Sequence, residues 1–451
     1  MSITSVDGKG NRPPAAGNTG LSRSLRRLLV FALLLGTWLP ALADSITLDE
    51  KEVFGETRWG ALPYFFATDS LGTAIGAAAF VSGVHQPQST LVGTAFVTDN
   101  DSWLVAGALT NYRFDDLERW FFNFYLQGSH FTDQRFYESP GRTTEPRAGS
   151  NDSDEDDFIS GISNDLHVEL TTRYVLPIGA GRENPLTIYR TRKGMRLSPP
   201  QGGRTWNPLE SGKTVIGARY FYRYRDLKEV NEEDKVTANT NGIELWLDYD
   251  NTDFLPNPTF GSRQKLTIIR DFGWFDSANS WTNLQLELSK YFDLGTSGWF
   301  RQQVLALNFW TSNTPTWDYD PKTGDINHRP PPGFGSELGG YDRLRGYPLG
   351  RFHDKSAVYY GAELRLTPVI NGLDKVPLLE FFEIDWWQVV GFAEMGRVAP
   401  DWDSDLLFKD LKWDVGLSLR IMTFRQPIRL DWAISDEDWS IWAMYDQPYS
   451  R

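Results

Sequence analysis

Runs of alternating apolar and polar residues recur through most of the chain, and each is about ten residues long, the length of a strand that crosses a membrane. From Trp120 to Gln127 the even positions are all apolar, whereas Asn123 and Gln127 lie among the odd positions. Similar runs are Gly242–Tyr249, Leu284–Ser289 and Trp413–Ile421. Because successive side chains of a strand point to opposite faces, each run predicts a strand with one apolar and one polar face.

Two all-β architectures fit this pattern. A soluble sandwich or propeller would turn its polar face to water, whereas a transmembrane barrel would turn its apolar face to lipid and its polar face to a wet lumen. The runs are longer than most soluble strands, and aromatic residues, 14% of the chain, crowd their ends as in a membrane-interface girdle. The sequence therefore predicts an all-β fold, a transmembrane antiparallel β-barrel of about sixteen strands. The predicted strand centres are Tyr64, Gly76, Thr94, Ala106, Phe124, Val168, Ala218, Leu245, Leu266, Leu286, Ala306, Glu363, Phe392, Leu417, Leu430 and Trp442.

The amino terminus resembles an export signal. Basic residues at positions 23, 26 and 27 precede the apolar run Leu28–Ala43, whose last three residues match a small-x-small cleavage pattern. A membrane anchor is the alternative, but the run is short for a spanning helix. We predict a signal peptide with a long n-region over residues 1–43, a short periplasmic lead over 44–58 and the barrel over 59–451.

Composition and motifs argue against several classes of function. The formal charge of −14 disfavours a nucleic-acid partner. The absence of cysteine excludes disulfides and thiolate metal sites, and five scattered histidines offer little for zinc. The sequence Gly161–Asp165 fails the nucleophile-elbow pattern at its last position, and no HExxH or P-loop is present. We therefore predict no enzyme activity, no cofactor and no metal site.

Three long segments interrupt the strand pattern: His130–Ser160, Pro177–Lys213 and Ser312–Asp354. The first contains an acidic run over residues 152–157, which lacks the glycine and the distal glutamate of a calcium loop and is interpreted as solvated surface. The second is basic. The third contains GGYDRLRGYPLGRF (Gly339–Phe352), whose apolar residues predict a loop that packs inward instead of extending into solvent.

The third segment also carries a family resemblance. Leu344-Arg345-Gly346-Tyr347 is similar to the (V/I/L)RG(F/Y) signature in the sixth extracellular loop of the BamA/TamA superfamily, also called bacterial surface antigen barrels. Phe392-Ala393-Glu394-Met395-Gly396 resembles the F-x-(D/E)-x-G strand motif of that family, and Asp248–Ile268 resembles its recurrent unit of strand, proline turn and strand. The likeness extends from about Trp59 to Tyr449, and a chance RGY match does not explain three motifs in order.

The resemblance implies a specific contact. In this family the sixth loop folds into the lumen, and its arginine pairs with the acid of the strand motif, which are here Arg345 and Glu394. The alternation places Glu394 on the lumen side with Phe392 and Gly396. An enclosed arginine needs an ionic partner to offset its lost hydration, and a carboxylate can bond to it twice. We expect Gly346 to permit a tight backbone turn, with Leu344 and Tyr347 packed beside it.

The resemblance also implies a function at the outer membrane of a Gram-negative bacterium, namely protein insertion or passenger export. The expected partners are outer-membrane lipid and a separately encoded periplasmic or secreted protein. A porin-like barrel, or a structural or lipid-handling barrel without translocation activity, is the alternative. Two departures from the family bear on this choice: the lead over residues 44–58 is too short for a POTRA domain, and the chain ends in Pro448-Tyr449-Ser450-Arg451 instead of an aromatic residue.

The basic segment Pro177–Lys213 follows the sixth predicted strand, whereas the sixth loop follows the eleventh. Strand parity therefore places the two segments at opposite ends of the barrel. With the sixth loop extracellular, the basic segment is periplasmic, where barrel turns are usually short. We expect it to replace a docking module.

Overall fold

The computed structural model describes residues 47–50, 57–68, 72–137, 146–229, 235–319, 326–373, 384–423, 426–445 and 448–449. The predicted signal peptide lies outside the described residues, as does part of the predicted periplasmic lead. The long strands are β2 (Arg58–Thr68), β3 (Gly72–Ser82), β4 (Thr90–Thr98), β5 (Trp103–Tyr112), β6 (Trp120–Phe136), β7 (Ile159–Val175), β11 (Lys213–Glu229), β13 (Thr240–Asp250), β14 (Gly261–Asp271), β15 (Trp281–Gly295), β16 (Phe300–Asn313), β21 (Ser356–Pro368), β22 (Trp386–Ala399), β23 (Lys412–Thr423), β24 (Gln426–Ser435) and β25 (Trp439–Tyr445).

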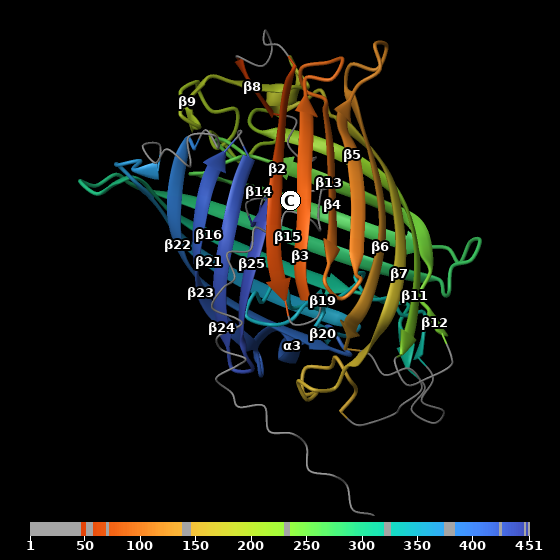
Figure 1. Cartoon of the computed structure of the whole chain (residues 1–451). Coiled ribbons are helices and arrows are strands. Elements are labelled where there is room, and N and C mark those ends of the chain that lie inside the picture. Colours follow the sequence, from red (N-terminus) through yellow and green to blue (C-terminus); the bar gives the residue numbers. More distant parts are fainter. Residues whose placement is uncertain are drawn as a thin grey trace, which may run out of the picture.

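These strands form one antiparallel sheet that closes into a barrel. Each long strand pairs with the next long strand along the chain, from β2 to β25. Every predicted strand centre falls within one of them. Figure 1 shows strongly tilted strands on the far wall of the barrel and steeper ones in front. The prediction of a barrel of about sixteen strands is therefore confirmed.

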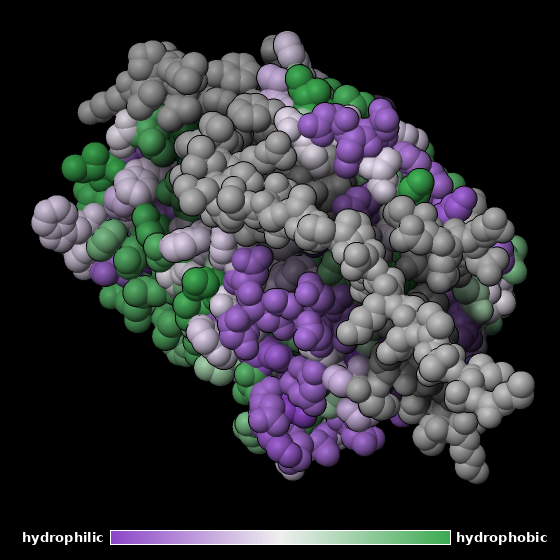
Figure 2. Space-filling model, turned by 60° about the horizontal axis from the view of Figure 1, so that its bottom comes forward, coloured by the Kyte–Doolittle hydropathy of each residue, from purple (hydrophilic) through white to green (hydrophobic). Residues whose placement is uncertain are grey.

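Large apolar side chains point outward on most of the long strands, although the inward faces of β3, β4 and β5 also carry buried apolar residues. On β6, Phe124 and Leu126 are 46% and 44% exposed, whereas Asn123 and Gln127 are buried. On β6 this is the reverse of a strand in a soluble protein, where apolar residues face the interior. Exposed tryptophans such as Trp103 lie at strand ends, as expected at a membrane interface. Figure 2 shows hydrophobic residues along the left flank and hydrophilic residues at the end that is turned forward.

No helix in the described part of the chain is long and apolar enough to span a membrane.

One end of the barrel carries the sixth loop (residues 314–355), and the described residues of this loop form four short strands. They are β17 (Asp318–Tyr319), β18 (Ile326–Asn327), β19 (Glu337–Leu338) and β20 (Phe352–His353). The same end carries α3 (Ser404–Phe408), as Figure 1 shows. The carboxylates at 152, 154, 155 and 156, in the connection from β6 to β7, are exposed, and the described residues contain no group of side chains that could hold a metal ion.

The opposite end carries the basic segment, as strand parity predicts (Figure 1). Its elements are η2 (Gly179–Gly181), β8 (Thr187–Tyr189), β9 (Thr191–Arg192) and β10 (Met195–Arg196). Residues of the predicted lead form β1 (Thr47–Asp49), which pairs in parallel with β8. We call residues 47–49 and 177–212 together the mouth cap. It is folded onto the barrel rim, because Arg196 pairs with Asp253 at 3.2 Å and Trp386 Nε1 donates to the carbonyl of Gly194 at 3.3 Å. β12 (Lys235–Thr237) extends the β11 edge at the sixth-loop end.

Cysteine labelling tests which end faces the cell exterior. Thr205 of the mouth cap and Ser404 of α3 are both exposed, and the natural chain contains no cysteine. With the sixth loop extracellular, Ser404→Cys reacts with a membrane-impermeant maleimide on intact cells, whereas Thr205→Cys reacts only after the outer membrane is permeabilised. Labelling of Thr205→Cys but not Ser404→Cys on intact cells would reverse this orientation.

Candidate functional site

The tip of the sixth loop lies inside the barrel. β19 pairs with β20, with Leu338 opposite Phe352, and this short ladder closes a hairpin over residues 339–351. Within the hairpin, Gly340 N–H donates to the carbonyl of Tyr347 at 3.0 Å. The side chains of Leu344, Arg345 and Tyr347 have 0% exposure. The loop residues that the sequence predicts to enter the lumen are therefore enclosed by the barrel.

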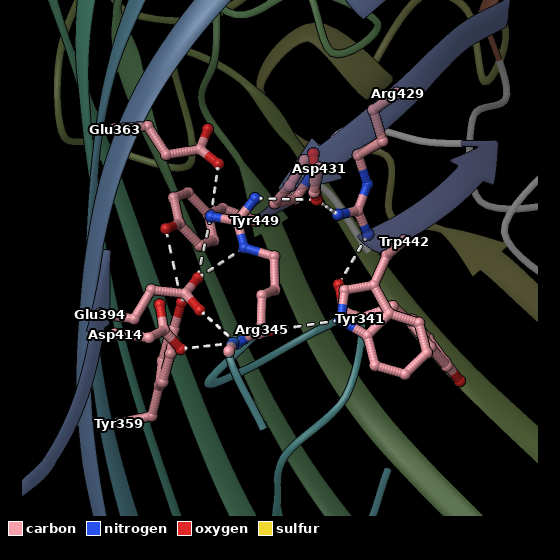
Figure 3. A network of polar contacts seen from close by, with 12 residues as sticks. Tyr341, Arg345, Tyr359, Glu363, Glu394, Asp414, Arg429, Asp431, Trp442 and Tyr449 are labelled. Carbon is pink, nitrogen blue, oxygen red and sulfur yellow. Dashed lines mark hydrogen bonds and ion pairs between the residues drawn. The ribbon is translucent and has the colours of Figure 1, made fainter. Parts of the chain in front are cut away.

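The guanidinium of Arg345 contacts three carboxylates from three strands (Figure 3). Its Nε donates to Glu394 Oε1 on β22 at 2.9 Å, and its two terminal nitrogens lie 3.0 Å from Asp431 Oδ2 on β24 and from Glu363 Oε1 on β21. The backbone N–H of Arg345 also donates to Glu394 Oε2 at 2.8 Å. Glu394 thus receives two hydrogen bonds from a single residue, which orients the backbone as well as the side chain.

The contact between Arg345 and Glu394 belongs to a larger buried cluster, which we call the lumen anchor. It comprises four arginines and four acidic residues, each at most 1% exposed: Arg345, Arg365, Arg420, Arg429, Glu363, Glu394, Asp414 and Asp431. Glu363 pairs with Arg365 at 2.8 Å and with Arg420 at 2.6 Å, and Arg429 contacts Asp431. Such a set is formally neutral when all members are ionised, which limits the cost of removing it from water.

Aromatic residues complete the environment of Arg345. Its guanidinium carbon lies 3.6 Å from the centre of the Phe392 ring, a cation–π contact that desolvation strengthens. The indole Nε1 of Trp442 on β25 donates to the Arg345 carbonyl at 2.8 Å. Tyr359 donates from its hydroxyl to Glu394 Oε1 at 2.6 Å. The arginine is therefore held through its backbone, its charge and the face of its guanidinium plane.

The glycine of the loop signature lies in a tight turn, in which the N–H of Tyr347 donates to the carbonyl of Leu344 at 3.1 Å. Gly346 does not adopt a positive φ, whereas Leu344 does, at 55°. The left-handed position of the turn is therefore occupied by a leucine, an unfavourable conformation that the surrounding contacts must maintain. Gly346 is needed for close approach: a Cβ there would lie 2.7 Å from Asp414 Cβ and 3.0 Å from Ser435 Cβ. Its N–H donates to Asp414 Oδ2 at 2.9 Å.

The glycine of the strand motif makes room for the loop in the same way. A Cβ at Gly396 would lie 2.9 Å from Leu338 Cδ1 and 3.4 Å from Leu344 Cδ1. The strand alternation is as predicted, because Phe392, Glu394 and Gly396 are buried while Ala393 and Met395 are exposed. The motif therefore supplies an aromatic face, a carboxylate and a space at three successive inward positions.

Tyr347 links the loop to the rim. Its hydroxyl donates to the carbonyl of Trp413 at 3.2 Å and to the carboxylate of Asp436. Its ring packs edge-on against Phe352 at 5.1 Å between centroids. Burial, and then the hydrogen bond to Asp436, raise the pKa of the phenol, so that it stays protonated and remains a donor at physiological pH.

A second arginine of the loop, which the sequence did not single out as a site residue, ties it to other connections at the same end. The side chain of Arg351 is fully buried and bonds twice to Glu437 in the β24–β25 turn, at 2.8 and 2.9 Å. It also donates to the hydroxyl and the carbonyl of Ser153 in the β6–β7 connection, at 2.8 and 2.7 Å. The loop therefore has one ionic attachment deep in the lumen and one at the rim.

Chain-terminal residues enter the lumen beside the anchor. The carbonyl of Tyr449 accepts hydrogen bonds from Ser289 and Tyr291, and that of Pro448 accepts one from Arg365 at 3.2 Å. Tyr449 is 5% exposed, and its hydroxyl lies 3.4 Å from that of Tyr359. Pro448 and Tyr449, the described residues of the final segment noted in the sequence, thus pack inside the barrel.

The sequence did not identify most members of the lumen anchor. Glu363 and Arg365 on β21, and Arg429 and Asp431 on β24, are paired charges at alternate positions on the lumen face. Two ionised residues at i and i+2 within an apolar strand run are the signal that could have revealed them, because both must point away from lipid. Which strands present them to Arg345 depends on the register, which the sequence does not supply.

Residues 119–438 match the model of the Omp85 superfamily domain. The crystal structure of BamA from Haemophilus ducreyi lacking POTRA domains 1-3 is similar, with a TM-score of 0.47 and 11% identity over 87% of this chain and 70% of that chain. CdiB from Escherichia coli gives a TM-score of 0.52 at 9% identity, covering 86% of this chain and 61% of that chain.

CdiB from Acinetobacter baumannii gives 0.47 at 10% identity, covering 85% and 58%. The chain therefore spans less than two thirds of either CdiB chain. At these identities the structural likeness concerns the fold alone. Among curated proteins, no match was found.

Mutations of Arg345 and of Glu394 should lower the free energy of unfolding by different amounts, although an isolated ion pair of these two residues would predict equal losses. Arg345→Ala leaves Glu394, Glu363 and Asp431 without a shared cation and should cost about 3 to 5 kcal/mol. Glu394→Gln leaves Arg345 with two carboxylates and should cost less. Protease cleavage of the sixth loop on intact cells, and the thermal midpoint in detergent, measure both.

Arg343→Ala is the matched control, because Arg343 lies in the same hairpin with a partly exposed pair to Glu287 at 3.3 Å. Its loss should cost at most about 1 kcal/mol. Equal cleavage of Arg345→Ala and Arg343→Ala would contradict the central role of Arg345.

Gly346→Ala tests close approach separately from charge. The added methyl group must displace Asp414 or the β24 backbone, so that we expect a loss of about 1 to 3 kcal/mol and a loosened loop. Gly391→Ala on β22 is the control, since a Cβ there meets nothing within 4 Å. The thermal midpoints of the two variants decide, and a Gly346→Ala protein as stable as Gly391→Ala would refute the steric role.

Proposed function

This chain belongs to the Omp85 superfamily, and from that premise we propose that it acts in protein insertion or passenger export across the outer membrane. Omp85 barrels reside in the outer membrane of Gram-negative bacteria and are transport and assembly proteins, not enzymes. The family fixes this location and general class. The specific role rests on what occupies the lumen.

The observation that carries the proposal is a sixth loop that crosses the lumen from wall to wall. On one side the lumen anchor binds it to β21, β22 and β24. On the other side, Arg225 of β11 donates to the carbonyl of Pro332 at 3.1 Å, and Phe334 stacks on Phe221 at 5.0 Å. A steady diffusion pore needs a clear lumen. A loop that is fixed to both walls suits a barrel whose lumen opens only when the loop moves, or a barrel that acts on its substrate at the wall.

The mouth cap supports a docking role on the opposite side. Its basic residues Arg190, Arg192, Lys193 and Arg204 are exposed, whereas Tyr189 beneath them is buried and donates to the carbonyl of Asp253 at 2.9 Å. The segment is thus folded, with its positive charges directed outward. We propose that it receives a separately encoded periplasmic or secreted protein with an acidic surface, for which charge complementarity raises the association rate.

Depletion of the protein tests the function. We expect the level of client outer-membrane proteins, or of one secreted passenger, to fall several-fold, because an assembly or export factor is used repeatedly. Wild-type and Arg343→Ala genes should restore the level, whereas Arg345→Ala should not. Arg190→Glu combined with Arg192→Glu should fail as well while leaving the thermal midpoint unchanged. Unchanged protein levels after depletion would refute the proposal and favour a structural barrel.

Conductance distinguishes the porin-like alternative in the same protein. In planar bilayers we expect the wild-type barrel to stay closed or to flicker, and deletion of residues 328–351 to open it. Steady ohmic conductance of the wild type would favour a porin.

A further inference from the structure

The outer wall of the barrel contains an apolar groove of about 750 Å³ that spans β14, β15, β16, β21 and β22. Apolar side chains line most of it, including Leu288, Leu307, Phe309, Tyr360 and Met395. These residues point outward, away from the lumen anchor. The volume lies within the range of pockets that bind small ligands, about 300 to 1,000 Å³.

Strand register creates the groove. Ala362 of β21 lies opposite Leu307 on one side and Ala393 on the other, so that two small residues adjoin on the outer face. In the neighbouring outward row, Tyr360 lies between Phe309 and Met395. A row of large side chains beside a pair of methyl groups leaves a trough in the lipid-facing surface.

A lysine lies at one end of the trough. Lys290 of β15 is half-buried on the outer face, and its Nζ lies 5.0 Å from the ring centre of Trp206 and 5.6 Å from that of Phe292. It forms no ion pair with any described residue. A cation on the outer wall of a membrane barrel is costly within hydrocarbon, and a phosphate at the membrane surface is the group that offsets its charge.

The position of Lys290 along the barrel fits a lipid head group. Just beyond it, Phe292, Asp293 and Leu294 are all exposed regardless of the face on which they lie, as expected where a hairpin leaves the sheet. Trp206 of the mouth cap is 66% exposed, typical of an aromatic residue at the membrane interface. The far end of the groove lies toward the sixth-loop end, where the Tyr360 hydroxyl donates to the carbonyl of Leu407 at 3.1 Å. The groove therefore begins at the interface and extends into the hydrocarbon region.

We propose that this groove binds one anionic phospholipid, with its phosphate against Lys290 under Trp206 and an acyl chain over Ala362 and Ala393. A lipid satisfies both parts of the site at once, because its phosphate offers the missing negative charge and its chain fills the apolar trough. The site lies at the mouth-cap end, so the lipid belongs to the leaflet that faces that end.

Native mass spectrometry of the full chain in detergent tests this with dilauroyl phosphatidylglycerol as the probe. We expect one lipid adduct that survives activation. Lys290→Gln should lower the retained fraction about tenfold, the effect of losing one charge-assisted contact. Ala393→Leu, which fills the trough from the lipid side, should lower it as well. Dilauroylglycerol, which lacks the phosphate, should bind to the wild type as weakly as the phospholipid binds to Lys290→Gln.

Two controls match these variants. Lys265→Gln removes a lysine of the adjacent strand whose Nζ lies 5.5 Å from the Trp246 ring on the lumen side. Ala95→Leu enlarges an exposed outward alanine on β4, away from the groove. Both should retain the lipid, and heat-modifiable migration should confirm that all four variants are folded.

Wild-type retention in Lys290→Gln, or in Ala393→Leu, would overturn the proposal, as would displacement of the lipid by equimolar inorganic phosphate. A protein dimer without lipid would assign the groove to a second copy and overturn it too. None of these results depends on client or passenger levels, so the lipid site and the proposed export or insertion role fail separately.

Discussion

The enclosed charge of Arg345 determines how the loop and the wall fit together. A guanidinium with no access to water is tolerated only where carboxylates and hydrogen bonds replace its hydration, and here Glu363, Glu394 and Asp431 provide them from three strands. Without the loop these carboxylates would still need cations nearby. Arg365 and Arg420, which belong to the barrel wall, supply part of this positive charge. The loop therefore completes a cluster that the barrel has already partly neutralised. This arrangement specifies one depth and one orientation for the loop, since a shift along the lumen would separate several charges together.

The sequence predicted the barrel well because its signal is repeated. Alternation with period two is local, and each strand reports its two faces without knowledge of its neighbours. The contact of Arg345 with Glu394 was predicted from the family resemblance, because strand periodicity does not indicate which residues pair. The rest of the lumen anchor depends on which residues become cross-strand neighbours, such as Glu363 opposite Phe392, and register across distant strands is a property of the closed sheet. The close approach at Gly346 was not foreseen for a related reason: a conformational need can be inferred from a turn, but a steric need requires the position of Asp414.

The two ends of the barrel differ in how their extra segments are held. The sixth loop is fixed by buried charges and crosses to β11, where Arg225 reaches Pro332. The pairing of β1 with β8 joins the two parts of the mouth cap. Tyr189 and the pair of Arg196 with Asp253 fix the cap at the rim, while its other basic residues stay in solvent. Electrostatic steering acts through exposed charge, whereas enclosed charge fixes geometry. The mouth cap thus has the exposed charge of a docking surface, and the sixth loop is a fixed support inside the lumen. A substrate that crosses the lumen would have to pass this loop or displace it.

The outer groove and the lumen anchor occupy the same strand segments on opposite faces. Ala362 precedes Glu363, and Ala393 precedes Glu394, so each pair of neighbours contributes one residue to lipid and one to the anchor. A strand cannot shift or rotate to suit one face without carrying the other, because the two side chains share a backbone. Any movement of β21 or β22 that weakens the hold on Arg345 also changes the trough over those alanines. The wall between the two sites is a single layer of backbone, which provides the contiguous physical connection that coupling between a bound lipid and the loop would require.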